Sequence, residues 1–168
     1  KRGCLKDRLF IQMCGDGLDS IVVHHLPLGL KRVFGKGAYV LQTLRDLTYY
    51  PFRSFKVQVD GNEVEAAGLV VTKGRYYAGR FQIAPQADPR EAHFHVVALQ
   101  QTHFMDALKH AAALGLGRLP YLSSISLQRG YDIQVFGADL PVQADGDDAG
   151  SLPIHIVPFA QPLSVVVP

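Results

Sequence analysis

The chain has 168 residues, of which 48% are hydrophobic and 19% are charged, and its formal net charge is +2. This composition excludes a disordered protein, and the length suits one domain, residues 1–168, that buries about 70% of the surface of its unfolded chain. The basic residues are scattered without forming a basic block, which speaks against a nucleic-acid partner.

The cysteines and the lack of a long apolar segment indicate the cellular compartment of the protein. Cys4 and Cys14 lack CxxC spacing and follow no signal peptide, so we expect reduced thiols in a cytoplasmic protein. No apolar run approaches the roughly 20 residues needed to cross a bilayer, and a contact with a membrane would be peripheral. The chain starts at Lys1 without an initiator Met, which suggests one domain of a longer enzyme.

The N-terminal third predicts a strand, a turn and a helix. Residues 9–14 form the apolar strand. Gly15-Asp16-Gly17 then fits either a phosphate-binding loop or a plain turn in which Asp19 caps the next element. The turn is favoured because the Lys and the hydroxyl residue of a P-loop are lacking. Residues 30–50 have helical spacing, and Pro51 ends that helix.

From residue 52 onward the apolar residues recur at every second position, as they do in strands. Residues 55–59 and 63–72 are predicted to pair through a turn at Asp60-Gly61. The elements expected next are a loop at 76–80, a strand at 81–84 and a strand at 93–100.

His93 and His95 stand two apart on the last of these strands and so share one face, where a metal could bridge them. No third ligand of matching type is near them in the sequence. We therefore favour solvent-facing histidines over a metal site.

A second amphipathic helix is predicted at residues 102–116, with Thr102 as its N-cap. His103 and His110 are expected on its surface. The residues expected to face the core are Phe104, Leu108, Ala111 and Ala112. A hairpin with strands at 122–128 and 131–136 is expected to follow, with its turn at Arg129-Gly130.

The last quarter has three alternating apolar runs, at residues 140–144, 152–157 and 163–167. Asp145-Gly146-Asp147-Asp148, the densest acidic cluster of the chain, separates the first two. Asp-Gly is a strong turn signal, because Gly accepts a positive φ and Asp bonds its own backbone. The residues alone favour a soluble hairpin tip over a pair of catalytic carboxylates. The chain then totals nine or ten strands and two or three helices, which predicts a mainly β fold, a β-sandwich-like domain with an α+β minority.

Several segments, in chain order, resemble the C-terminal domain of the diacylglycerol kinase and sphingosine kinase family of lipid kinases, the bacterial members especially. The motifs that carry the resemblance are Gly17-Leu18-Asp19, Lys31, Gly35, Ala38-Tyr39, Asp60-Gly61, Ala78-Gly79, Ala84-Pro85-Gln86-Ala87, Asp145-Gly146-Asp147 and the closing Leu152-Pro153-Ile154-His155-Ile156-Val157-Pro158. The resemblance covers nearly the whole chain.

The resemblance implies a β-sandwich-like domain that follows an N-terminal nucleotide-binding domain. That domain carries a Gly-Gly-Asp-Gly-Thr signature, which is absent here. The implied cofactors are ATP and Mg²⁺, both bound mainly by the N-terminal domain, so the 168 residues alone are expected to be inactive. The implied site consists of Asp145 and Asp147 as catalytic carboxylates, Gly146 beside the cofactor and Asp19 near the acceptor hydroxyl.

Three positions depart from the family pattern. Thr72 stands in place of an Asn, and Asp147 in place of the signature Glu. Glu91-Ala92 replaces the Asp-Gly of a metal-binding loop in bacterial relatives. This change leaves Glu91 as the candidate metal ligand and speaks against a structural Mg²⁺.

The partners that the resemblance implies are a lipid substrate, either diacylglycerol or a sphingoid base, and the N-terminal domain in cis. The lipid and the oligomeric state, a homodimer included, stay open. Two alternatives remain: a non-catalytic β-sandwich that binds lipid or protein, and an enzyme similar to NAD kinases.

Overall fold

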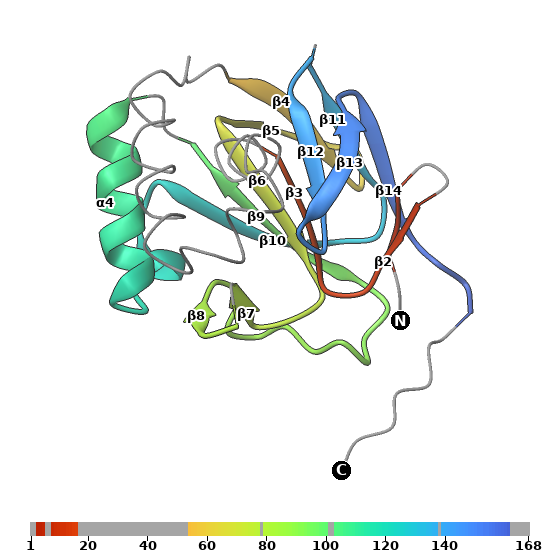
Figure 1. Ribbon diagram of the computed structural model, residues 1–168, viewed down its shortest axis with the longest axis horizontal. Coiled ribbons are helices and arrows are strands. Elements are labelled where there is room, and N and C mark those ends of the chain that lie inside the picture. The colour runs from red at the N-terminus through yellow and green to blue at the C-terminus, as the bar shows by residue number, and fades with distance from the viewer. Residues whose placement is uncertain are drawn as a thin grey trace, which may run out of the picture.

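The computed structural model describes residues 3–5, 8–16, 54–77, 79–100, 103–137 and 139–161. These ranges contain fourteen strands, one α-helix and one short 3-10 helix (Figure 1). The predicted mainly β, sandwich-like fold is confirmed. The strand count exceeds the expected nine or ten for two reasons. Two predicted strands, at residues 9–14 and 63–72, are each divided in two, and the strands Gly3–Leu5, Tyr76–Tyr77 and Asp147–Ser151 were not predicted. The predicted helix at 30–50 and the predicted strand at 163–167 lie outside the described residues.

Two six-stranded antiparallel sheets form the sandwich. The first, called sheet A here, has the order β2-β1-β14-β11-β4-β5. Its strands are β1 (Gly3–Leu5), β2 (Arg8–Phe10), β4 (Phe55–Val59), β5 (Asn62–Ala66), β11 (Ile133–Phe136) and β14 (Ile154–Pro158).

The second sheet, sheet B, has the order β10-β9-β6-β3-β12-β13. Its strands are β3 (Met13–Asp16), β6 (Gly68–Thr72), β9 (Phe94–Leu99), β10 (Ile125–Gly130), β12 (Pro141–Ala144) and β13 (Asp147–Ser151). The remaining elements are the small pair β7 (Tyr76–Tyr77) and β8 (Phe81–Gln82), the helix α4 (Phe104–Gly115) and the 3-10 helix η1 (Leu119–Tyr121).

The main core lies between the two sheets. Alternation in β4 buries Phe55, Val57 and Val59 on one face, as its sequence predicts. Phe10 of sheet A and Phe94 of sheet B are both fully buried and stack with ring centroids 5.8 Å apart. This aromatic contact joins the two sheets.

A second, smaller core covers the outer face of sheet B, beneath α4 and the loop after β8 (Figure 1). Strand β9 is therefore buried on both faces: Val96 points into the main core and Val97 into the second. Burial on both sides explains why residues 94–99 read as a nearly continuous apolar run.

Three connections differ from the predictions because the chain passes between the sheets at points where the sequence keeps its strand pattern. Residues 9–14 divide into β2 and β3, and residues 63–72 divide at Ala67 into β5 and β6. The predicted hairpin at 122–136 is wrong, because β10 belongs to sheet B and β11 to sheet A. Residues 76–80, predicted as a loop, include β7. Alternation marks a strand but does not tell which sheet it joins.

Helix α4 confirms the predicted helix, but its buried face differs from the predicted one. His110 and Ala113 are its buried residues, whereas Phe104 and Leu108 are exposed by 39% and 44%. The His110 ring nitrogen Nε2 lies 2.9 Å from the Ser124 hydroxyl, and this partner satisfies a polar group that the sequence assigned to the surface. The apolar residues of this helix are distributed around much of its circumference, so their spacing in the sequence does not define a single buried face. The N-cap residue is His103 and not the predicted Thr102, and its side chain makes no capping hydrogen bond.

We expect the buried His110 to make the protein less stable in acid. Burial lowers the pKa of His110 below its ordinary value; the charge of Asp106 opposes this to a smaller extent, and that of Lys109 adds to it. Burial likewise lowers the pKa of His95. The unfolded chain binds these protons near pH 6.5 and the folded chain binds them only at lower pH. The free energy of unfolding is therefore fully retained above about pH 6.5 and falls as the pH drops below it, by at most about 1.4 kcal/mol per pH unit for each histidine.

Urea unfolding at pH 7.5, 6.5 and 5.5 measures this loss. His110→Gln should flatten the profile, and an equal loss in the variant and the parent protein would contradict the assignment.

Among the residues that the structure describes, we find no helix with the length and hydrophobicity of a membrane span.

Candidate functional site

The acidic turn lies at the tip of the β12–β13 hairpin, beside β3 (Figure 1). Ala144 pairs with Asp147 across a two-residue turn. Asp145 and Gly146 there have φ angles of 52° and 88°, the conformation that Asp-Gly favours in hairpins. The turn was predicted, but its second strand is β13, not residues 152–157, which run as β14 in the opposite sheet. Asp147 is therefore a strand residue at the edge of sheet B.

The Asp145 carboxylate binds the backbone of this same chain. Its Oδ2 accepts a hydrogen bond of 2.7 Å from the N–H of Ile11. Its Oδ1 accepts bonds of 2.9 Å and 3.0 Å from the N–H groups of Gln12 and Met13. The Asp145 N–H in turn donates to the Met13 carbonyl at 2.9 Å. These bonds fasten the acidic turn to the bend between β2 and β3, where the chain crosses from one sheet to the other.

We expect Asp145→Ala to lower the free energy of unfolding by about 1.5 kcal/mol, the upper part of the range for a carboxylate that caps backbone N–H groups. Urea unfolding measures the change. Asp147→Ala is the matched control two residues away, and its effect on stability should be negligible because its ion pair is exposed. Equal effects of the two substitutions would contradict the anchoring role of Asp145.

Asp147 projects from the turn, with 76% of its side chain exposed. Arg8 of β2 reaches it, with Nη2 3.3 Å from Oδ2, and also donates through Nη1 to the Asp148 carbonyl. The Gly146 N–H donates to the buried Gln143 side chain at 2.9 Å, and no atom lies within 4 Å of where a Cβ of Gly146 would stand. The turn thus presents an accessible carboxylate beside an unobstructed stretch of backbone.

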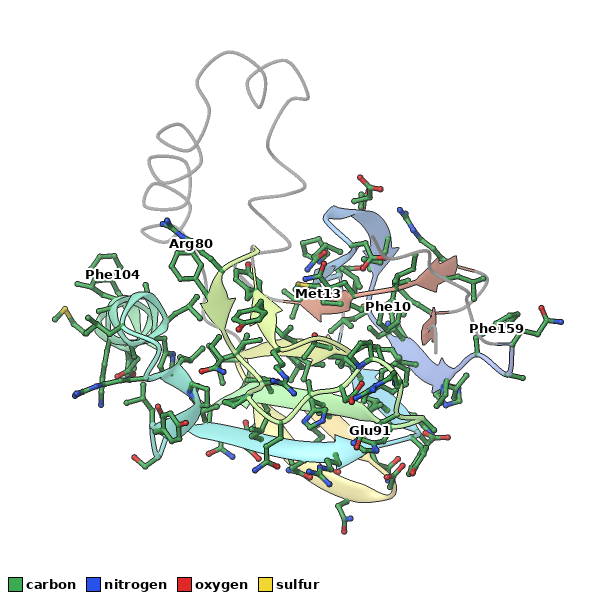
Figure 2. The ribbon with its side chains drawn as sticks, turned by 90° about the horizontal axis from the view of Figure 1, so that it is seen from below. Phe10, Met13, Arg80, Glu91, Phe104 and Phe159 are labelled. Atoms are coloured by element: carbon green, nitrogen blue, oxygen red, sulfur yellow. The ribbon has the colours of Figure 1, made fainter. Side chains whose placement is uncertain are left out.

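Glu91 lies in another part of the molecule, well apart from Met13 at the acidic turn (Figure 2). The buried Lys73 donates from Nζ to the carbonyls of Glu91, Ala92 and His93 at 2.6, 3.3 and 2.7 Å. Three such bonds require the ammonium form, which has three N–H groups. Because a cationic side chain already binds these carbonyls, and Mg²⁺ demands an octahedron of oxygen atoms, this loop does not fit Mg²⁺.

The side chains of this loop form a separate cluster. Glu91 Oε2 lies 3.0 Å from His93 Nε2, and the His93 and His95 rings have centroids 5.2 Å apart. His95 is only 2% exposed, so the predicted solvent-facing orientation is wrong for it. The outer face of sheet B is covered at this point, and neighbouring segments bury the ring. Burial is the main cause that lowers the pKa of His95, followed by the charges of His93 and Arg129.

In the structure, the predicted site residues lie in two separate parts of the molecule. Asp145, Gly146 and Asp147 share the acidic turn, whereas Glu91 does not belong to it. Asp19 lies outside the described residues. Sequence reasoning missed Arg8 and Lys73, because a single cation beside a strand carries no signal of its distant partners.

The sequence of residues 13–167 matches the family model described as the YegS C-terminal NAD kinase beta sandwich-like domain. The chain belongs to this family. The resemblance to the C-terminal domain of the lipid kinases is thereby confirmed, and the β-sandwich in its description agrees with the two sheets of this YegS C-terminal domain.

Two similar proteins span about twice the length of this YegS C-terminal domain. It is 22% identical over 170 residues to a protein named diacylglycerol kinase from Staphylococcus aureus (strain JH9), with 99% of this chain and 54% of that protein covered. A crystal structure described as a diacylglycerol kinase from Bacillus anthracis str. Sterne shares the fold, with a TM-score of 0.63 and 20% identity over 93% of this chain and 51% of that chain.

Proposed function

We propose that this YegS C-terminal domain is one half of an ATP-dependent lipid kinase, which transfers the γ-phosphoryl group of ATP to the hydroxyl of diacylglycerol or a sphingoid base. The supporting observation is the acidic turn, which combines an anchored Asp145 with an Asp147 side chain that is 76% exposed. Relatives that bear the name diacylglycerol kinase are about twice as long, and we assign nucleotide binding to a companion domain outside these 168 residues.

The residues of the acidic turn divide the work in this proposal. Asp147 accepts the proton of the lipid hydroxyl. The hydroxyl oxygen bonds to the γ-phosphorus of ATP while the bond from that phosphorus to ADP breaks and ADP leaves. Asp145 is a positioning residue, since its oxygens already accept three backbone hydrogen bonds. Gly146 gives the cofactor phosphates room beside the backbone. Mg²⁺ bound with ATP offsets the negative charge of the phosphates. Asp19, as the residue that orients the acceptor hydroxyl, completes the proposed set.

Radiolabelled ATP tests the proposal with diacylglycerol, sphingosine and NAD as separate acceptors. We expect no turnover by the 168-residue chain and lipid phosphorylation by the protein that includes the companion domain. Turnover by the 168 residues alone would overturn the division between the two domains. Phosphorylation of NAD instead of lipid would overturn the substrate class and favour the alternative enzyme similar to NAD kinases.

One observation favours the second candidate, a module that binds lipid surfaces without catalysis. Apolar side chains on and just after α4 are exposed, with exposed fractions of 68% for Met105 and 75% for Leu116. Under this function, Met105→Glu and Leu116→Glu each reduce co-sedimentation with phosphatidylcholine vesicles several-fold, because a charge opposes insertion among the lipids. Phe136→Glu, on the exposed side of β11, is the matched control. Binding that survives both helix substitutions would exclude this surface.

A further inference from the structure

Three side chains with metal-ligand chemistry meet on the outer face of sheet B. Glu91, His93 and His95 each contribute one ligand atom, and these atoms all lie within 4.8 Å of one another. His95 belongs to β9, and His93 is the last residue of the bend at residues 91–93 that precedes this strand. Their ring centroids lie 5.2 Å apart, and the same bend brings the carboxylate of Glu91 to them.

Both imidazoles carry a buried nitrogen without a hydrogen-bond partner. The Nε2 atoms of His93 and His95 are the two such side-chain atoms found in the described part of the chain. His93 Nε2 lies 3.0 Å from Glu91, but the contact lacks the direction of a hydrogen bond. A buried polar atom without a partner costs stability, and native structures rarely leave two side by side. A metal ion between them would satisfy both lone pairs.

One member of the cluster, His95, borders a hollow at the surface. His95 lines an open hollow of about 280 Å³, together with Gln86, Gln128 and Arg129. This hollow provides an entry path for an ion and room for a further ligand such as water. The backbone carbonyls of the same loop bind Lys73, so they take no part.

We propose that Glu91, His93 and His95 form a binding site for a first-row divalent ion of the Zn²⁺ class, held by one carboxylate oxygen and two Nε2 atoms. Two imidazoles and one carboxylate suit Zn²⁺ and Co²⁺ and are a poor set for Mg²⁺. Ligand atoms around a tetrahedral Zn²⁺ stand about 3.4 Å apart, so the present separations close through small side-chain rotations. The site rests on its own residues and is independent of the kinase proposal.

The nearest cations define a second expectation. Arg129 pairs with His95 across β9 and β10, which places it on the same face, and Lys73 lies behind the loop. Both charges oppose a divalent ion, while Glu91 favours it. Arg129→Gln removes one opposing charge without touching a ligand and should tighten metal binding several-fold.

The test titrates the 168-residue chain with ZnCl₂ by calorimetry and with CoCl₂ by visible absorption. We expect the d–d bands of a four-coordinate Co²⁺ site, and a melting temperature raised by about 5 to 10 °C when Zn²⁺ is 100-fold above its dissociation constant. Glu91→Gln and His93→Gln should each weaken binding at least about 10-fold. The control is His155→Gln, which removes another imidazole that pairs with a carboxylate, Asp132, and should leave binding unchanged.

Three results would overturn the site. They are Co²⁺ spectra without four-coordinate bands, Zn²⁺ binding that both Glu91→Gln and His93→Gln leave intact, and displacement of Zn²⁺ by an equal concentration of Mg²⁺. The Co²⁺ spectrum is measured on the unsubstituted chain, so the site remains testable even if His93→Gln fails to fold.

Discussion

We expect Lys73→Met to lower the free energy of unfolding by about 3 kcal/mol and the melting temperature by about 6 to 12 °C. Lys73 is 1% exposed, and its ammonium binds three loop carbonyls and lies 5.1 Å from the centroid of the Phe94 ring. Met has a similar stem but no donor, so the substitution keeps the packing and leaves buried carbonyls without a partner. Urea unfolding, together with the thermal transition, measures the loss.

Lys56→Met is the matched control for this prediction. Lys56 is a strand residue with 65% of its side chain exposed, and its Nζ lies 2.8 Å from Glu63. An exposed pair of this kind contributes little, so the control should unfold as the parent protein does. If Lys73→Met and Lys56→Met behaved alike, the three carbonyl contacts would not be the reason for the burial of Lys73.

The second large effect concerns activity. We expect Asp147→Asn, in the protein that includes the companion domain, to lower kcat for lipid phosphorylation at least about 100-fold, the scale of general base catalysis. The amide keeps the shape of the side chain but cannot accept the proton. KM for ATP and the free energy of unfolding should stay close to those of the parent protein, because the ion pair of Asp147 with Arg8 is exposed. Steady-state kinetics with diacylglycerol in mixed micelles measures the change.

Asp147→Glu distinguishes proton transfer from a general effect of charge. It restores the residue of the family signature, and we expect it to retain or raise kcat. Asp145→Asn should instead reduce kcat together with stability, because the positioning bonds to residues 11–13 weaken. Full activity of Asp147→Asn would refute the role of Asp147 and support a non-catalytic module.

Local patterns were enough to predict most strands and the acidic turn. The alternation at residues 55–59 and the Asp60-Gly61 and Asp145-Gly146 turns follow from side-chain period and from φ preferences, both of which act over a few residues. The order of the motifs along the chain also indicates the family. The catalytic roles of Asp145 and Asp147 and the cofactor contact of Gly146 stay predictions.

Only the tertiary structure decided what these residues contact. Asp145 meets residues 11–13 and Lys73 meets residues 91–93 through pairings that no local pattern encodes. The buried face of α4 and the burial of His95 likewise depend on which segments cover sheet B. The sequence by itself determined a β-rich domain with an acidic Asp-Gly turn, since those properties arise from neighbouring residues. The different environments of Asp145, which is anchored, and Asp147, which is exposed, follow from the tertiary fold. The reason is that the crossing of the chain between the two sheets brings the β2–β3 bend against the turn.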